Sequence, residues 1–332
     1  MDDSETKRLG SHVLITGGAG FIGSHLTRRL LHRGDRITVL DNFNDFYDPA
    51  RKRANVAPFL ELPEDRYSLV EGDIRDAGTV DPLFAERGFD AVVHLAARAG
   101  VRPSLQQPIL YEEVNCIGTL RLLEAARHHG PENFVFGSSS SVYGINEKVP
   151  FSEDDEVNQP ISPYATTKRT GELLCYNYHH LYGLKTSCLR FFTVYGPAKR
   201  PEMAIHKFTD LLARGEAIPL YGDGSSRRDY TYIDDILDGV VAALDLAPDF
   251  EILNLGGAET TALSDLVRWI AEELGVEPKI DYLPNQPGDV PITYADVTKA
   301  GRLLDYSPQV PIREGLARFV AWYKREHGFD ST

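Results

Sequence analysis

A tyrosine and a lysine stand four residues apart in the segment Tyr164-Ala165-Thr166-Thr167-Lys168. On a helix, residues i and i+4 share a face, so Lys168 can lie beside Tyr164. A nearby positive charge lowers a phenol's pKa by favouring the phenolate. Without such help, a tyrosine near its ordinary pKa of ~10 cannot act as a base at neutral pH. The pair therefore indicates proton transfer at a hydroxyl group, although such pairs also occur by chance on surface helices.

A glycine-rich turn near the N-terminus supplies the context that the pair needs. The apolar strand at 12–16 leads into Gly17-Gly18-Ala19-Gly20-Phe21-Ile22-Gly23, and an apolar-periodic helix follows. Glycines at this spacing allow a tight turn, close approach of the backbone to a diphosphate, and close packing of the helix on the strand. A strand, a glycine turn and a helix together predict a dinucleotide site whose contacts are Gly17, Gly20, Phe21, Ile22 and Gly23.

The second expected strand ends at Asp41, about twenty residues beyond the glycines. A carboxylate in this place can accept hydrogen bonds from the adenosine ribose. No Arg or Lys follows Asp41 until Arg51, so a 2′-phosphate would meet a negative charge. The sequence therefore predicts NAD as the cofactor, in preference to NADP.

Glycines in the pattern GxxGxxG, with YxxxK far downstream, resemble the extended short-chain dehydrogenase/reductase family over nearly the whole chain. The resemblance implies Tyr164 and Lys168 as catalytic and cofactor-binding residues. It also implies Ser139, aligned on Val142-Tyr143-Gly144, as the hydroxyl that assists the tyrosine. Further cofactor contacts that it implies are Asn42, Asp73, Ile74, Leu95, Ala96 and Ala97.

Longer strings resemble the UDP-sugar 4-epimerases of this family, and among them the branch that acts on UDP-glucuronate. Thr193 stands where UDP-glucose epimerases carry Asn, and Ala198-Lys199 departs from the usual residues of the glucuronate branch. The strings that carry the likeness are Asp41 to Pro49, Phe191 to Pro197, Arg200 to Ala204, Arg228 to Asp235 and Gln286 to Val290.

This resemblance implies inversion of C4 of a UDP-sugar through a 4-keto intermediate, with UDP-glucuronate giving UDP-galacturonate. Tyr164 would take the proton of the C4 hydroxyl while a hydride leaves for NAD, and Ser139 would bind the same oxygen. Arg228 would contact the diphosphate. The remaining expected substrate contacts are Ser140, Ser141, Thr193, Arg200, Lys207 and Asp289.

The order of expected elements indicates an α/β fold. Strand and helix signals alternate to about residue 195, which predicts a doubly wound parallel Rossmann sheet. Prolines gather in the C-terminal half and favour a smaller substrate-binding lobe. We expect a NAD-binding domain at 1–190, with 228–256 returning to it, and a UDP-sugar lobe at 191–227 and 257–332. Expected strands are 12–16, 36–41, 67–71, 91–95, 133–137 and 185–191, and expected helices include Tyr111 to Ala126 and Tyr164 to Tyr182.

Composition limits the partners and the location of the chain. Its 332 residues are 42% hydrophobic and carry a formal net charge of -14, which argues against nucleic acid or an anionic membrane as the main partner. The three cysteines are too few and too scattered for a disulfide framework or a metal site, and we expect no bound metal. The chain has no apolar run long enough to span a bilayer or to act as a signal peptide, which predicts a cytoplasmic protein.

Two alternatives to a UDP-glucuronate epimerase stay open from the sequence. One is an epimerase of a neutral UDP-sugar, either UDP-glucose/UDP-galactose or an N-acetylhexosamine. The other is a dinucleotide-sensing or scaffold protein without turnover, although a tuned phenol would serve no purpose there. Family resemblance also implies a homodimer through the helices at 111–127 and 162–182.

Overall fold

The computed structural model describes residues 10–284 and 290–329. The chain divides into two compact units. In the described residues, unit 1 comprises 10–142, 160–190 and 237–253, and unit 2 comprises 143–159, 191–236, 254–284 and 290–329. The chain therefore passes between the units several times, and neither unit is one continuous stretch of sequence.

Unit 1 is built on a seven-stranded sheet with the order β11-β6-β5-β4-β1-β2-β3. The pairs β1–β2, β1–β4, β2–β3 and β4–β5 are parallel. From β1 the chain adds β2 and β3 on one side, and from β4 it adds β5, β6 and β11 on the other. β1 and β4 therefore flank the switch point where doubly wound sheets bind ligands. The strands are β1 (His12–Thr16), β2 (Arg36–Asp41), β3 (Tyr67–Glu71), β4 (Ala91–His94), β5 (Asn133–Ser139), β6 (Thr186–Phe191) and β11 (Phe250–Leu255).

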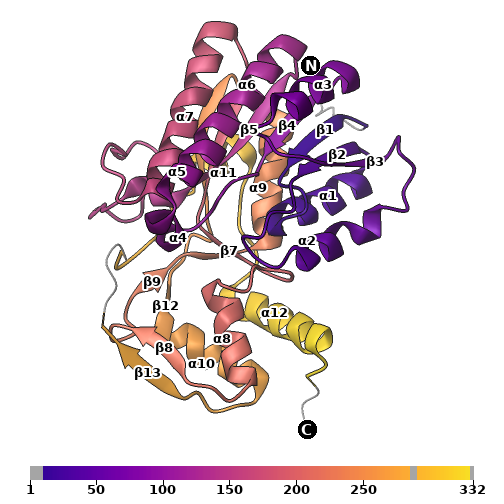
Figure 1. The fold of residues 1–332 in the computed structure, drawn as a ribbon. Coiled ribbons are helices and arrows are strands. Elements are labelled where there is room, and N and C mark those ends of the chain that lie inside the picture. The colour runs from indigo at the N-terminus through magenta and orange to yellow at the C-terminus, as the bar shows by residue number, and fades with distance from the viewer. Residues whose placement is uncertain (1–9, 285–289, 330–332) are drawn as a thin grey trace, which may run out of the picture. The chain divides into compact units, whose positions relative to one another are not determined.

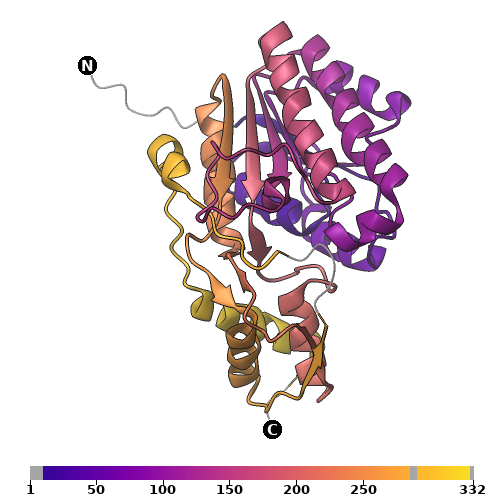
Figure 2. The ribbon, with the colours of Figure 1, turned by 90° about the vertical axis from the view of Figure 1, so that its left-hand side faces the viewer.

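Helices cover both faces of this sheet, with α6 and α7 on one side and α9 on the other (Figure 1 and Figure 2). Arg33 of α1 pairs with Asp245 of α9 at 2.7 Å, which joins two helices on the second face. The helices are α1 (Phe21–Arg33), α2 (Pro49–Val56), α3 (Ala77–Arg87), α4 (Val101–Gln106), α5 (Pro108–Tyr111), a π-helical turn (Glu112–Ile117), α6 (Gly118–His129), α7 (Pro163–Tyr182) and α9 (Ile233–Leu246), with short 3-10 turns at Ala57–Phe59 and Ser140–Tyr143.

Strands in the middle of the sheet are buried along their whole length because helices cover them on both faces, and most of their residues are apolar. Every residue of β1, β4 and β5 is buried. The predicted α/β fold, a doubly wound parallel Rossmann sheet followed by a smaller C-terminal part, is confirmed. The expected helix from Tyr111 to Ala126 is interrupted by the π-helical turn at Glu112–Ile117, which helical periodicity did not predict.

The strands of unit 2 are short and pair two by two in the part that the structure describes. β7 pairs with β10 and β8 with β13 in parallel, and β9 pairs with β12 in antiparallel fashion. The elements are β7 (Thr193–Tyr195), α8 (Ala204–Ala213), β8 (Ile218–Tyr221), β9 (Arg227–Arg228), β10 (Tyr230–Tyr232), β12 (Thr261–Ala262), α10 (Leu263–Leu274), β13 (Ile280–Leu283), α11 (Thr298–Leu304) and α12 (Ile312–His327).

The units and the expected domain limits differ at two segments. Residues 143–159 were expected in the cofactor domain but belong to unit 2, and the returning segment is 237–253 where 228–256 was expected. The reason for the first difference lies in Phe151, whose N–H donates to the carbonyl of Tyr294 at 2.7 Å and whose ring lies 6.3 Å from that of Phe192. These contacts attach the segment that follows β5 to unit 2.

Candidate active site

The glycine turn between β1 and α1 is folded so tightly that only glycine fits at several positions. Gly17 has a φ of +71°, and a Cβ there would lie 2.7 Å from the backbone nitrogen of Ala96. A Cβ on Gly23 would overlap the carbonyl oxygen of Gly17. The turn therefore lies directly against the end of β4 and against the first turn of its own helix.

This turn fits the diphosphate of a dinucleotide. The N-cap of α1 is Gly20, which makes no side-chain cap, and the first turn of α1 carries no acidic residue. The first backbone N–H groups of a helix have no partner within it, and together with the helix dipole they favour an anion. We therefore keep Gly17, Gly20, Phe21, Ile22 and Gly23 as the candidate contacts of the cofactor diphosphate.

Asp41, the candidate ribose contact, holds the glycine turn. Its carboxylate accepts the N–H of Ala19 at 3.1 Å and that of Phe43 at 2.9 Å. Burial raises the pKa of Asp41, and the charge of Lys52 acts in the opposite direction. Sequence reasoning missed both the bond to Ala19 and this buried lysine on α2.

Asn42 and Asp73 come together at the ends of β2 and β3. The Asn42 side-chain amide donates to Asp73 at 2.9 Å, and Arg75 pairs with the same carboxylate at 2.8 Å. The Arg75 hydrogen bonds lower the pKa of Asp73 to about 2. Ile74, in contrast, is a buried core residue, packed so closely on Gly118 that a Cβ there would lie 2.5 Å from its Cδ1.

The end of β4 is fixed beside the glycine turn by Thr16. Its carbonyl accepts the N–H of Leu95 at 3.0 Å, and its hydroxyl accepts that of Ala96 at 3.3 Å. The buried His94 ring lies between the hydroxyls of Thr16 at 2.7 Å and Thr119 at 2.9 Å. Burial lowers the pKa of His94 to about 3, so this histidine is neutral and structural. Ala97 continues the same half-buried segment.

Tyr164 and Lys168 lie one turn apart at the start of α7. Ser162 caps this helix by accepting the N–H of Ala165 at 3.1 Å, and Pro163 is its first residue. Tyr164 is half-buried, whereas Lys168 is only 6% exposed. Burial lowers the pKa of Lys168 to about 8, so the ammonium form still predominates at neutral pH.

Two contacts tie α7 to β5, the strand that ends at Ser139. The Lys168 ammonium donates to the carbonyl of Gly137 at 2.7 Å, and Ser138 donates to Glu172 at 2.6 Å. Ser139 in turn lies 3.2 Å from Ser141, oxygen to oxygen, and accepts the N–H of Ser141 at the same distance. The structure thus brings Lys168 to the strand end that carries the candidate serines.

Asn115, in the π-helical turn, is a buried residue that sequence reasoning missed. Its side chain accepts the N–H of Arg98 at 2.8 Å and donates to the Arg98 carbonyl at 2.9 Å. It also donates to the hydroxyl of Thr167 at 2.9 Å, between Tyr164 and Lys168 in α7. Asn115 therefore connects the segment after β4 to the helix of the candidate base.

Glu172 is a second missed residue that holds α7 in place. It makes two hydrogen bonds with Arg190 of β6, at 2.8 and 3.0 Å, and both side chains are buried. Arg169 adds an ion pair with Glu172 at 3.0 Å. A buried carboxylate with these partners fixes the rotation of α7 against the sheet.

The candidate substrate residues of unit 2 begin with Thr193 and Arg228. Thr193 is half-buried and donates its N–H to the carbonyl of Asp229 at 3.1 Å, so it lies next to the strand that follows Arg228. Asp229 itself is fully buried and accepts N–H groups from Gly257 at 2.7 Å and Ala295 at 3.1 Å. Burial raises the pKa of Asp229 to about 6.

Arg200 lies in the loop between β7 and α8. Its guanidinium pairs with Glu202 at 3.2 Å and contacts the sulfur of Met203 at 3.6 Å, with the side chain 19% exposed. Lys207 is exposed on α8. Asp289 lies outside the residues that the structure describes.

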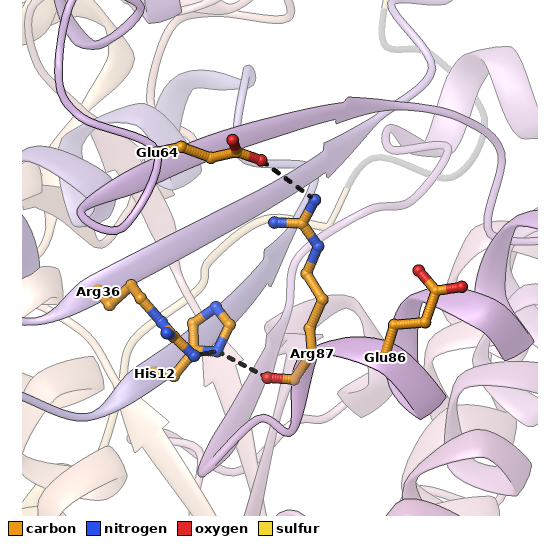
Figure 3. Close-up of a pocket in the computed structure, with 5 residues that line it drawn as sticks. All are labelled: His12, Arg36, Glu64, Glu86 and Arg87. Atoms are coloured by element: carbon orange, nitrogen blue, oxygen red, sulfur yellow. Dashed lines mark hydrogen bonds and ion pairs between the residues drawn. The ribbon is translucent and has the colours of Figure 1, made fainter.

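A polar cavity of about 300 Å³ lies at the opposite edge of the sheet, at the amino ends of β1 and β2. Figure 3 shows the His12 ring between Arg36 and Arg87, with Glu64 and Glu86 beyond them. Arg87 pairs with Glu64 at 3.9 Å, Arg36 contacts the His12 ring, and burial lowers the pKa of His12 to about 4. This cavity has neither the chemistry nor the location of the candidate site.

The glycine turn and the doubly wound sheet define a dinucleotide-binding protein of the Rossmann class. The sequence pattern of the NAD dependent epimerase/dehydratase family matches residues 13–256, and the chain belongs to that family. Membership confirms NAD as the cofactor and places the chain among the NAD-dependent nucleotide-sugar epimerases and dehydratases.

Several relatives of known activity resemble the chain along most of its length. UDP-glucuronate 4-epimerase 4 of Arabidopsis thaliana is 43% identical over 95% of this chain and 75% of its own length. A UDP-glucuronic acid 4-epimerase from Bacillus cereus, solved with UDP-glucuronic acid and NAD, has a TM-score of 0.89 and 36% identity over 95% of this chain and 99% of that one. A UDP-glucose 4-epimerase from Thermotoga maritima, solved with UDP-glucose, has a TM-score of 0.86 and 32% identity over 95% of this chain and 99% of that one.

The chain shows no sign of a membrane segment in the part that the structure describes. None of the helices there combines the length and the apolar character that crossing a bilayer requires. All three cysteines, Cys116, Cys175 and Cys188, are buried free thiols.

Replacing Gly17 by alanine should remove the bound cofactor and destabilise unit 1. The new Cβ would lie 2.7 Å from the Ala96 nitrogen, in addition to the cost of about 1–2 kcal/mol for a left-handed residue. Gly130→Ala is the matched control, because its φ is +68° and nothing lies within 4 Å of its Cβ. Denaturant unfolding and assay of the NAD released on denaturation would compare the two variants. If Gly17→Ala and Gly130→Ala lost equal stability and both retained NAD, the lack of a side chain at Gly17 would have no role in packing or in cofactor binding.

Proposed function

We propose that the chain inverts C4 of UDP-glucuronate through a 4-keto intermediate, giving UDP-galacturonate. One observation carries the proposal: the buried ammonium of Lys168 lies one helical turn from Tyr164 and is bonded to the carbonyl of Gly137, in the strand that ends at Ser139. This arrangement supplies a cation for a phenolate base and a hydroxyl on the neighbouring strand. The Bacillus cereus enzyme, solved with UDP-glucuronic acid, supports the choice of sugar.

In the proposed reaction the chain's own residues move a single proton. The Tyr164 phenolate oxygen takes the proton of the C4 hydroxyl, and the Ser139 hydroxyl donates a hydrogen bond to the same sugar oxygen as its charge changes. Lys168 favours the phenolate before this step. NAD, when held by the candidate contacts from Gly17 to Lys168, would supply the acceptor for the C4 hydride and the donor for its return. After the keto sugar turns over, Tyr164 gives the proton back, and the configuration at C4 is inverted.

The sugar carboxylate needs partners of its own, because a 4-keto uronic acid is a β-keto acid. Such an acid loses carbon dioxide when its carboxylate bond aligns with the carbonyl π system. Ser140 and Ser141 offer hydroxyl donors and carry no carboxylate that would repel the sugar. Thr193 adds another donor, and Arg200 adds the positive charge. We propose that these residues hold the carboxylate out of alignment, and that Ser139 and Tyr164 hold the C4 hydroxyl.

The same proposal divides the cofactor and the nucleotide between two domains. The candidate NAD contacts, from Gly17 to Lys168, fall in the expected domain 1–190, and Thr193, Arg200, Lys207, Arg228 and Asp289 fall in or at the edge of the expected lobe. Arg228 is proposed to meet the diphosphate, while Lys207 and Asp289 are proposed for the uridine. A net charge of -14 makes such local cations necessary, because the overall field repels a nucleotide sugar.

The alternatives make different demands on the same residues. A neutral UDP-hexose epimerase, for which the Thermotoga maritima enzyme is the precedent, has no use for Arg200 at the sugar. A dinucleotide sensor has no use for the buried Lys168 beside Tyr164. Incubation with UDP-glucuronate and with UDP-glucose, followed by NMR of the products, separates the three. We expect UDP-galacturonate from the first and little product from the second.

We also propose that the enzyme is a homodimer. Large apolar side chains are exposed on the helices from Pro108 to His129 and on α7, among them Ile109, Ile117, Leu173 and Tyr176. Pairing these helices with a second copy would bury them. A measured mass of twice the chain mass, reduced to one chain mass by Leu173→Glu, would support the dimer, and a monomer at all concentrations would contradict it.

A further inference from the structure

Lys199 is a buried lysine in the loop that carries Arg200, at a position where the sequence departs from the glucuronate branch. The side chain is only 6% exposed, and its ammonium donates to the carbonyl of Val194 in β7, the residue after Thr193. The preceding Ala198 has a φ of +59°, a conformation that non-glycine residues adopt only when their surroundings hold it. The loop is therefore built around this lysine.

The backbone of Lys199 is held as firmly as its side chain. Its N–H donates to the carbonyl of Gly196 at 3.2 Å, and its own carbonyl accepts Nδ1–H of His206 at 2.7 Å. The His206 ring is buried and packs within 6 Å of several aromatic rings of α12, namely Phe319, Trp322 and Tyr323. Lys199 thus cannot turn away from its neighbours without disturbing the junction of α8 and α12.

Three charged or titratable groups act on Lys199. Burial, followed by the positive charge of Arg200, lowers the pKa of Lys199 to about 7, and the negative charge of Glu202 acts in the opposite direction. His206, the third, is bonded to the Lys199 carbonyl. Burial and the repulsion from Arg200 both disfavour the charged form of Lys199, so its protonation depends on what Arg200 is paired with.

We propose that Lys199 is a proton-linked specificity residue, which gains a proton when an acidic sugar pairs with Arg200 and so adds a second positive charge beside the sugar carboxylate. This inference rests on the proposed function, in which Arg200 meets that carboxylate. Lys199 lies against the strand of Thr193, the other proposed carboxylate contact in unit 2. A neutral hexose would leave the repulsion between Arg200 and Lys199 unchanged.

The repulsion between Arg200 and Lys199 determines how the affinity for the acidic sugar depends on pH. A carboxylate on Arg200 offsets its charge, so the pKa of Lys199 rises above its value of about 7 in the free enzyme. Between these two pKa values the complex holds more protons than the free enzyme, so affinity for the acidic sugar falls as pH rises above about 7. The fall is at most about tenfold per pH unit for one proton.

Calorimetric titration measures the proton directly. NAD-loaded Tyr164→Phe enzyme, which should bind without turnover, is titrated at pH 8 with UDP-glucuronate and with UDP-glucose, in two buffers of different ionisation enthalpy. We expect UDP-glucuronate to take up at least about 0.4 of a proton more than UDP-glucose, as a pKa that rises from about 7 past the buffer pH requires. The diphosphate and uridine are common to both ligands, so their contribution cancels.

Two variants in the same background separate titration from structure. Lys199→Arg keeps a permanent charge, so it should bind UDP-glucuronate without extra proton uptake and with less change in affinity between pH 7 and 9. Lys199→Met should lose both the uptake and part of the preference for the acidic sugar. The inference would be overturned if the Tyr164→Phe enzyme with Lys199 intact took up equal numbers of protons with both sugars. It would also be overturned if the extra proton uptake with UDP-glucuronate persisted in Lys199→Arg. If the protein without substitutions failed to epimerise UDP-glucuronate, that result would instead overturn the proposed function.

Discussion

Tyr164→Phe is expected to lower the rate of epimerisation by about 10² to 10⁴, the usual loss when a general base is removed. The variant keeps the ring, which packs edge-on against Tyr111 at 6.3 Å, and loses only the hydroxyl. Binding of the UDP-sugar and retention of NAD should therefore change little. Turnover measured by product NMR, together with the dissociation constant of the UDP-sugar, would test both halves of this expectation.

The matched control is Tyr282→Phe, which deletes the same hydroxyl from a tyrosine without a proposed role. Tyr282 lies on β13 and is 63% exposed, so loss of its hydroxyl should leave the rate unchanged. If Tyr164→Phe kept more than about a tenth of the activity, far above the range for a lost base, another group would be taking the proton.

Arg200→Ala is expected to reduce the preference for UDP-glucuronate over UDP-glucose by about 10- to 100-fold. A carboxylate left without its charged partner in a closed site costs about 1–3 kcal/mol. The freed carboxylate could also rotate into alignment with the C4 carbonyl, so some intermediate should lose carbon dioxide and yield a UDP-pentose. The ratio of kcat/KM values and NMR of the products would show both effects.

Arg214→Ala controls for the loss of an arginine from unit 2. Arg214 is 61% exposed and pairs with Asp210 on α8, with no proposed part in the reaction. Its removal should leave the sugar preference and the products unchanged. If Arg200→Ala also changed neither, Arg200 would not be the carboxylate partner, and the neutral UDP-hexose alternative would gain support.

The fold could be predicted from the sequence because each local signal agrees with the global arrangement. Glycines at 17, 20 and 23 follow a fully buried strand with an apolar centre, and this pattern has few structural solutions. Strands β1 to β3 have the bounds that the apolar runs indicated. The seventh strand, β11, lies far along the chain and was expected only as part of a returning segment.

The residues that position the candidate base could not be predicted in the same way. Asn115 bonds to Arg98, 17 residues before it, and to Thr167, 52 residues after it. Glu172 and Arg190 meet across a helix and a strand. Such pairs arise from tertiary packing, on which helical periodicity carries no information.

Lys52 illustrates the same limit at the cofactor site. NAD was expected because no cation stands close to Asp41 in the sequence. In the folded chain, however, Lys52 is buried and its charge acts on Asp41. The choice of NAD was correct, but the sequence around Asp41 described the electrostatics incompletely. Asp229 is similar, since its sequence string indicated only a family likeness, whereas its carboxylate is fully buried against backbone N–H groups.

The most direct test of the account is the fate of the hydrogen on C4 of UDP-glucuronate. The purified, NAD-containing enzyme would be incubated in ordinary water with UDP-glucuronate that carries deuterium at C4, and the products followed by NMR. We predict UDP-galacturonate that retains the deuterium at C4, with UDP-glucose turned over far more slowly. A product that has exchanged the label with water, a UDP-pentose as the main product, or faster turnover of UDP-glucose would contradict the proposed reaction.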